Sequence, residues 1–183
     1  MSTTERRQLM IAADQHKPPE IGLWLWALED IRQKTLEVID TIVPAEVDWF
    51  PSSNESSIGS VLRHIADVEA DWLYVEVLEK PRPADILGLF PESEKDEQRE
   101  NRGMHIPQVK GFTINQHVAR LKFVRSAVLE VYRGMDLDDF RRVRKLESYD
   151  VTPEWVLYHL IEHEAEHRGQ LIAIRDRIRQ GKE

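Results

Sequence analysis

The sequence contains no cysteine, which excludes both a disulfide framework and a metal site built from thiolates. Any metal ion must therefore be held by nitrogen and oxygen ligands, and any thiol chemistry would need a thiol brought in from outside the chain. Long hydrophobic runs are missing too. The longest runs from Ile21 to Leu28 and ends at Glu29, far short of the length that spans a membrane.

The first residues, Met1-Ser-Thr-Thr-Glu-Arg-Arg, lack the apolar stretch that a secretory signal needs, so we expect a cytoplasmic protein. An excess of positive charge is also lacking. The formal net charge is -8, which argues against a protein that binds nucleic acid through its phosphates. We therefore expect a small-molecule substrate as the partner, with neither nucleic acid nor a membrane bound.

Helical periodicity dominates what is present, in a chain long enough for one domain. The pattern predicts helices over four segments, at residues 21–43, 58–79, 113–134 and 152–179. About thirty residues, 80–112, join the second and third, and a crossover this long can connect two parallel helices of a bundle. No internal repeat is evident, and alternation typical of a strand is confined to a short piece near 141–148. The prediction is an all-α four-helix bundle over residues 21–180, preceded by a tail or extension at 1–20.

Two helix starts are marked clearly. Thr113-Ile-Asn-Gln116 has the capping-box pattern, in which a threonine and a glutamine satisfy each other's backbone amides. Thr152-Pro153 combines a capping residue with proline at the first helical position.

Three histidines fall on the stripes of two helices that we expect to face the core. His163 and His167 are four residues apart, in a series with Leu160 and Leu171, and His64 takes an apolar position of the second helix. One such histidine is more typical of a core residue with a hydrogen-bond partner. A pair four residues apart can clamp a metal ion, and His64 adds a third nitrogen, as in catalytic zinc sites that leave a position open for water. The predicted metal ligands are His64, His163 and His167.

The other histidines are weaker candidates. His159 continues the stripe of the fourth helix backwards and is expected either to support a ligand or to pack near the helix start. His117 is expected to line a pocket wall or to face solvent. Either residue in a fourth coordination position would favour a structural metal site over a catalytic one. His16 and His105 lie in polar, irregular regions and carry no signal.

Residues 163–167 contain the string H-E-x-x-H of zinc peptidases, whose third ligand follows further along the chain. Here no histidine follows, and the only later glutamate is Glu183. The match is therefore interpreted as coincidental for proteolysis, with Glu164 pointing away from the metal toward a helix neighbour or solvent. Glu162 and Glu166 are expected on the polar face, where either could hold a ligand imidazole.

The second-helix stretch Ser57-Ile-Gly-Ser-Val-Leu-Arg-His64-Ile-Ala-Asp and the fourth-helix stretch His163-Glu-Ala-Glu-His167-Arg-Gly-Gln-Leu resemble the DinB/YfiT-like superfamily. The resemblance extends over roughly residues 21–179. It implies a metal-binding four-helix bundle with the long crossover between its second and third helices. It also implies that the three histidines hold one divalent ion (zinc, nickel or iron) at one end of the bundle, and that the protein is a homodimer.

The same resemblance implies a metal-dependent enzyme of one of two kinds. One is an S-transferase or isomerase that uses a low-molecular-weight thiol, and the other is a hydrolase of small molecules. A non-catalytic, metal-binding stress-response protein is the alternative from another class. Arg63, Arg168 and Arg175 are the candidates for attracting an anionic thiol, although we expect a surface salt bridge for Arg63. Trp72, two turns from His64, is a candidate pocket wall, although a tryptophan on an apolar stripe is more typical of the core. The catalytic residues stay open.

Overall fold

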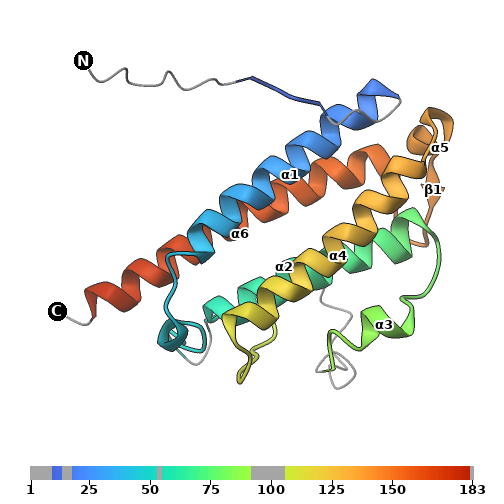
Figure 1. The fold of residues 1–183 in the computed structure, drawn as a ribbon. Coiled ribbons are helices and arrows are strands. Elements are labelled where there is room, and N and C mark those ends of the chain that lie inside the picture. The colour runs from blue at the N-terminus through green and yellow to red at the C-terminus, as the bar shows by residue number, and fades with distance from the viewer. Residues whose placement is uncertain (1–9, 14–17, 53–54, 92–105, 182–183) are drawn as a thin grey trace, which may run out of the picture.

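The computed structural model describes residues 10–13, 18–52, 55–91 and 106–181. Its framework is a bundle of four long helices (Figure 1): α1 (Pro19–Ile39), α2 (Ile58–Asp71), α4 (Ile114–Gly134) and α6 (Pro153–Gln180). Shorter elements complete it: η1 (Pro44–Glu46), the π-helical turn η2 (Trp72–Val77), α3 (Ala84–Leu87), α5 (Leu137–Arg141), and an antiparallel pair of strands, β1 (Arg144–Lys145) and β2 (Asp150–Val151). The predicted all-α four-helix bundle is confirmed.

The bundle helices run parallel in two pairs. Gly59 at the start of α2 lies against His117 in the first turn of α4, so these two helices point the same way. Arg175 near the end of α6 bonds Thr41, just beyond the end of α1, so these two are parallel as well (Figure 1). Because α2 and α4 are parallel, the chain between them must return along the bundle. The long crossover does this, and residues 92–105 of it lie outside the described part.

The helix ends follow the local chemistry of the sequence. The Thr113 hydroxyl accepts from the Gln116 amide at 3.3 Å, and the Gln116 side chain accepts from the Thr113 amide at 2.7 Å, which completes the predicted capping box. The second helix does not continue as one α-helix to residue 79. It widens into η2 after Asp71, and Leu78 N bonds back to the carbonyl of Leu73, five residues earlier.

A layer of buried charge divides the core into two apolar clusters. One cluster includes Ile65 and Leu171, and the other includes Leu28 and Leu157. Between them each bundle helix contributes one charged side chain. These four residues form what we call the buried charge ring: Arg32 of α1, Glu69 of α2, Arg125 of α4 and Glu164 of α6.

In the buried charge ring each carboxylate binds both guanidinium groups. Arg32 donates to Glu69 and to Glu164, each at 2.7 Å. Arg125 donates to the same two carboxylates, at 2.8 Å in the case of Glu164. The ring has no net charge, and this mutual pairing offsets the cost of removing four ions from water. Burial alone would raise the pKa of Glu164, but the two guanidinium groups outweigh it and hold the pKa below its usual value.

The two halves of the bundle repeat the same pattern, so the expectation that the sequence has no internal repeat was wrong. Residues 28–38 of α1 and 121–131 of α4 share the string L-x-x-[IV]-R-x-x-x-L-E-V. Residues 57–71 and 152–166, which begin α2 and α6 with their caps, share [ST]-x-x-x-V-L-x-H-[IL]-x-[DE]-x-E-A-[DE].

The contacts of the two halves repeat as well. The first helix of each half supplies an arginine to the buried charge ring, and the second supplies a glutamate. Arg32 also donates to the carbonyl of Leu121, and Arg125 donates to the carbonyl of Leu28, the corresponding residue of the other half. The bundle therefore has approximate twofold symmetry, which exchanges α1 with α4 and α2 with α6.

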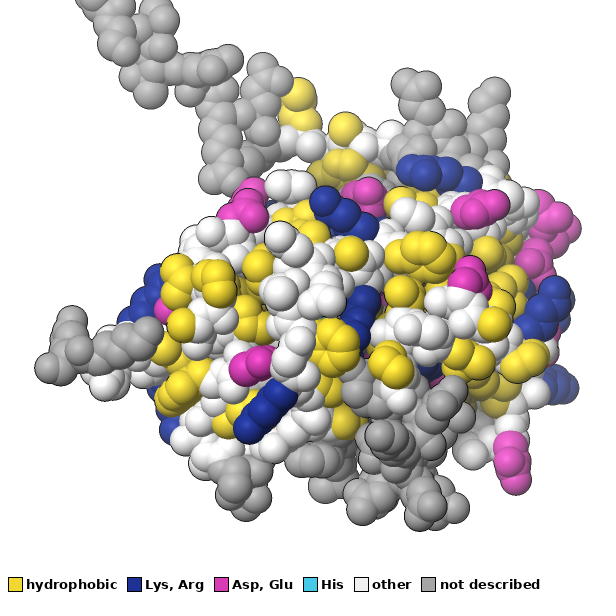
Figure 2. Space-filling model, turned by 60° about the horizontal axis from the view of Figure 1, so that its bottom comes forward, with side chains coloured by type: hydrophobic (Ala, Val, Ile, Leu, Met, Phe, Trp, Pro, Cys, Tyr) yellow, Lys and Arg dark blue, Asp and Glu magenta, His cyan; other side chains and the backbone are white. Residues whose placement is uncertain are grey.

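The face shown in Figure 2, which lies at the bottom of Figure 1, mixes hydrophobic side chains with charges of both signs. Among the described residues on this face, Lys and Arg side chains form no continuous patch, in keeping with the net charge of -8. No helix in the described part of the chain is both long and apolar enough to cross a membrane.

Candidate metal centre

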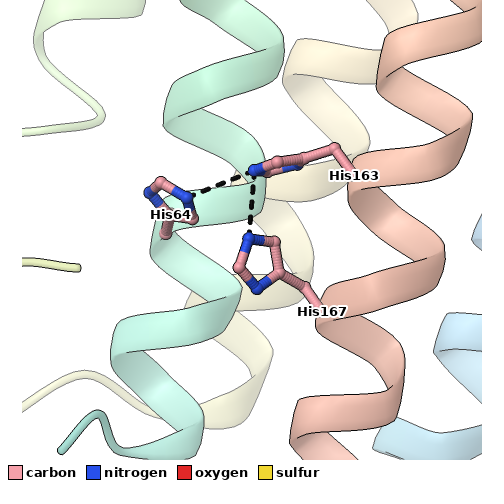
Figure 3. Close-up of side chains that lie close together, drawn as sticks. All are labelled: His64, His163 and His167. Carbon is pink, nitrogen blue, oxygen red and sulfur yellow. Dashed lines mark hydrogen bonds between the residues drawn. The ribbon is translucent and has the colours of Figure 1, made fainter. Parts of the chain in front are cut away.

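Three histidine side chains converge between α2 and α6 (Figure 3). His163 and His167 lie on successive turns of α6 with their Nε2 atoms 3.0 Å apart, and His163 Nε2 is 3.2 Å from His64 Nε2 on α2. Within residues 10–13, 18–52, 55–91 and 106–181, these three form the only group of at least three side chains placed to hold one metal ion.

The two nitrogen separations measured from His163 suit a metal ion. Imidazole nitrogens bind zinc at about 2.0–2.1 Å, so two of them on one tetrahedral or octahedral ion lie about 2.9–3.4 Å apart. The observed separations of 3.0 and 3.2 Å fall within that range. The residues present therefore fit a divalent ion bound through nitrogen.

The surroundings keep two of these rings neutral at physiological pH. Burial and the neighbouring His167 lower the pKa of His64 to about 4. Burial, with His167 and His64 beside it, lowers the pKa of His163 to about 2. A neutral imidazole offers the lone pair that a metal requires, so these rings are ready to bind an ion without first losing a proton.

Gln170 orients the third ring. Its Oε1 lies 2.8 Å from His167 Nδ1, which places the ring proton on Nδ1 and leaves the Nε2 lone pair facing the cluster. Glu162 and Glu166, the residues expected to support a ligand, are exposed, and Glu162 accepts a hydrogen bond from Tyr158. The only sequence signal for Gln170 was the Arg-Gly-Gln string that follows His167.

The prediction that Leu160, His163, His167 and Leu171 share the core-facing side of the fourth helix was wrong in one respect. The buried face of α6 carries Leu160, Glu164 and Leu171, whereas His163 and His167 are half-buried on the flank that faces α2. The buried charge ring makes this possible, because its arginines let a glutamate occupy the innermost position. The cluster also lies near the middle of α6, so its expected place at one end of the bundle is corrected.

Glu164 points away from the cluster, as predicted, and toward helix neighbours. Its side chain is 2 % exposed and bonds within the core, to Arg32 and Arg125 and also to Thr35. A peptidase would need this glutamate beside the metal as a general base. The H-E-x-x-H string thus combines two half-buried histidines on the flank of α6 with an anion that belongs to the core.

His117 takes no part in the cluster, and the expectation that it lines a pocket or faces solvent was wrong. It is 1 % exposed between α4 and α2, where a Cβ on residue 59 would lie 3.0 Å from its Nε2, so the close approach needs Gly59. Burial and the nearby Arg120 lower its pKa to about 4. His16 and His105 lie outside the described residues.

His159 lies between the cluster and a cavity. Its ring stacks on Trp155 at a centroid distance of 5.2 Å, lies 4.6 Å from the ring of Trp72, and is 5.8 Å from the ring of His163. The cavity measures about 540 Å³ and is lined by Trp72, Val143, Tyr149, Asp150, Val151, Thr152 and Trp155. Trp72 therefore lines this cavity and also packs against the apolar cluster that includes Leu28, so it is both pocket wall and core residue.

Two of the three arginines considered for binding an anionic thiol are paired with carboxylates. Arg63 is 2 % exposed, pairs with Asp67 at 3.2 Å and lies over the ring of Phe90, so the expected surface salt bridge is a buried one. Arg175 bonds its neighbour Asp176 at 2.8 Å. Arg168, directly after His167, is half-buried.

Comparison with known proteins completes the description of this centre. The sequence model of the DinB superfamily matches residues 27–171. The fold is similar to that of YfiT from Bacillus subtilis, described as a probable metal-dependent hydrolase with an unusual four-helix bundle topology. That match has a TM-score of 0.61 and 16% identity, and covers 95% of this chain and 93% of that one. A conserved protein from Enterococcus faecalis matches with a TM-score of 0.57 and 13% identity, over 84% and 93% of the two chains. No protein of curated function matches the sequence.

Proposed function

The chain belongs to the DinB superfamily, and from that premise we propose that it is a metal-dependent hydrolase of small molecules. One divalent ion (zinc, nickel or iron) is held by His64, His163 and His167. The observation that carries the proposal is the convergence of three imidazole Nε2 atoms at separations of 3.0 and 3.2 Å. The description of the similar YfiT protein as a probable metal-dependent hydrolase supports the same reaction class.

When bound, such an ion supplies Lewis acidity that activates water or polarises a carbonyl group. The protein's part is to hold neutral rings in place, which Gln170 does for His167. The three histidines are half-buried, so part of their surface stays open to solvent. Among the described residues no fourth side chain joins the group, which favours an open catalytic site over a closed structural one.

The proposed substrate carries an apolar, preferably planar, group. The cavity of about 540 Å³ has the size of a small-molecule site, and Trp72 and Trp155 give it aromatic walls. A substrate with its apolar end in the cavity would pass His159 to bring its reacting group to the histidines. This is why the two tryptophans are assigned to binding and the three histidines to the reaction.

Thiol-dependent transfer is the second candidate function. Non-catalytic metal binding is the third. An anionic thiol needs basic groups near the metal. Arg63 and Arg175 are already paired with carboxylates, which leaves Arg168, next to His167, as the candidate. Hydrolysis needs no such partner and is placed first. Assembly as a homodimer stays part of the proposal, on the basis of the family resemblance, and light scattering of the purified protein tests it.

The first experiment measures the metal content of untagged protein purified without a nickel column. We expect about one ion per chain in the wild type and in His159→Ala, since this ring lies next to the cluster without joining it, and none in His64→Ala. No ion in the wild type, and none taken up from added zinc, would contradict the proposal at its root.

The second experiment separates the three candidates. We expect hydrolysis of 1-naphthyl acetate that stops with a chelator and returns with zinc, and a preference for this ester over ethyl acetate that falls about tenfold in Trp155→Ala. Turnover of an electrophile only with an added thiol would identify a transferase. A bound ion without any turnover would favour the third candidate, a non-catalytic metal-binding protein.

A further inference from the structure

The metal cluster has an equivalent position in the other half of the bundle. The two similar stretches that begin α2 and α6 start at residues 57 and 152 and align without gaps. In this alignment His64 corresponds to His159. The positions that correspond to His163 and His167 carry Val68 and Trp72.

The six side chains of the two positions have similar burial, and one pair of rings in each has a similar separation. All six are half-buried. The rings of His64 and His167 have centroids 4.9 Å apart, and the rings of His159 and Trp72, the corresponding pair, have centroids 4.6 Å apart. The approximate twofold symmetry that exchanges the members of the buried charge ring therefore also exchanges the metal cluster with the position formed by His159, Val68 and Trp72.

We propose that His159, Val68 and Trp72 occupy a second metal-binding geometry of this fold, in which one of three ligands is present. The backbone places Trp72, at the end of α2, beside His159 of α6, as it places His167 beside His64 in the first position, and Val68 lies one turn before Trp72 on α2. A valine and a tryptophan stand where the first position has imidazoles, so in the natural sequence this position contributes aromatic and apolar wall to the cavity. With imidazoles introduced at positions 68 and 72, it would take a divalent transition-metal ion.

The local backbone supports this equivalence and sets its limits. The amide of Trp72 donates to the carbonyl of Val68, so the two positions are one α-helical turn apart although η2 begins at Trp72. Val75 corresponds to Gln170, so the second position lacks the amide that orients a ligand ring. Because loss of such an orienting contact weakens metal sites about 10–100-fold, we expect the restored site to bind more weakly than the first by a similar factor.

The test is the variant Val68→His/Trp72→His, equilibrated with zinc and analysed for metal per chain, with cobalt absorption as a second readout of nitrogen ligation. We expect one more ion per chain than in the wild type. Adding His159→Ala removes the extra ion, whereas adding His64→Ala removes the original ion and keeps the extra one. This pair of matched alanine variants assigns each ion to its own histidine.

A folded double variant that binds no more metal than the wild type, or an extra ion that persists in His159→Ala, would overturn the proposal. If the double variant does not fold, Trp72→His alone in a His64→Ala background keeps Val68 in place. We then expect a weaker, zinc-dependent rise in thermal stability that His159→Ala abolishes, and its absence counts against the proposal. The inference does not depend on the proposed function, because uptake through His159 is measurable even if the natural cluster binds nothing.

Discussion

Replacing Glu164 by glutamine will destabilise the bundle and leave the histidine cluster able to bind metal. The Glu164 side chain is 2 % exposed and accepts from Arg32 at 2.7 and 3.1 Å and from Arg125 at 2.8 Å. With a neutral glutamine at position 164, the buried charge ring holds two guanidinium groups but only one carboxylate away from water. Breaking a buried pair in this way costs about 3–5 kcal/mol. With a urea m-value of about 2 kcal/mol/M, the unfolding midpoint falls by about 1.5–2.5 M.

The matched control is Glu166→Gln, an exposed position two residues along the same helix, where the expected change is below about 0.5 kcal/mol. Adding Arg125→Met to Glu164→Gln returns the ring to zero net charge, so the double variant should lose less stability than the two single losses combined. A loss below about 1 kcal/mol in Glu164→Gln would refute the ring as a source of stability. Unchanged stability with abolished hydrolysis would instead make Glu164 a general base.

Two further predictions concern the cluster itself. Gln170→Ala frees the ring of His167, and we expect zinc affinity measured against a competing chelator to fall about 10–100-fold; an unchanged affinity would remove Gln170 from the site. In metal-free protein the pKa values of His64 (about 4) and His163 (about 2) lie below the value of about 6.5 for an unfolded chain. The unfolded chain then binds more protons below pH of about 6.5, so stability is complete above that pH and decreases as the pH falls toward 4. Urea midpoints across this range measure it, and a midpoint independent of pH would contradict the lowered values.

The helices and the histidines were predictable because their signals are local. A threonine cap and a glutamine three residues later specify the start of α4 regardless of the rest of the chain. His163 and His167 share a helix face by spacing alone, and only the position of His64 on its own helix was needed to suggest that the three meet. The prediction that they hold a metal is separate and awaits the metal analysis.

The buried charge ring could not be predicted in the same way. Arg32 and Glu164 are charged residues, which periodicity assigns to the solvent face, and their burial depends on partners from all four helices. The role of Gln170 could not be predicted either. A glutamine on a polar stretch looks like a surface residue until the structure shows its side chain beside His167 Nδ1. The repeat was hidden because the two halves share spacing and residue class at a few positions while most others differ.

The buried charge ring also has a consequence for the order of events during folding. Arg32 and Glu164 are separated by 132 positions in the chain, so the ring closes only when the first and last bundle helices have met. An assembly of three docked helices would hold at least one buried ion without its partner, which makes such an intermediate costly. Contacts of this range also slow the search compared with bundles whose neighbouring helices follow one another directly. We therefore expect a single cooperative transition, in which the two halves form their final interface together.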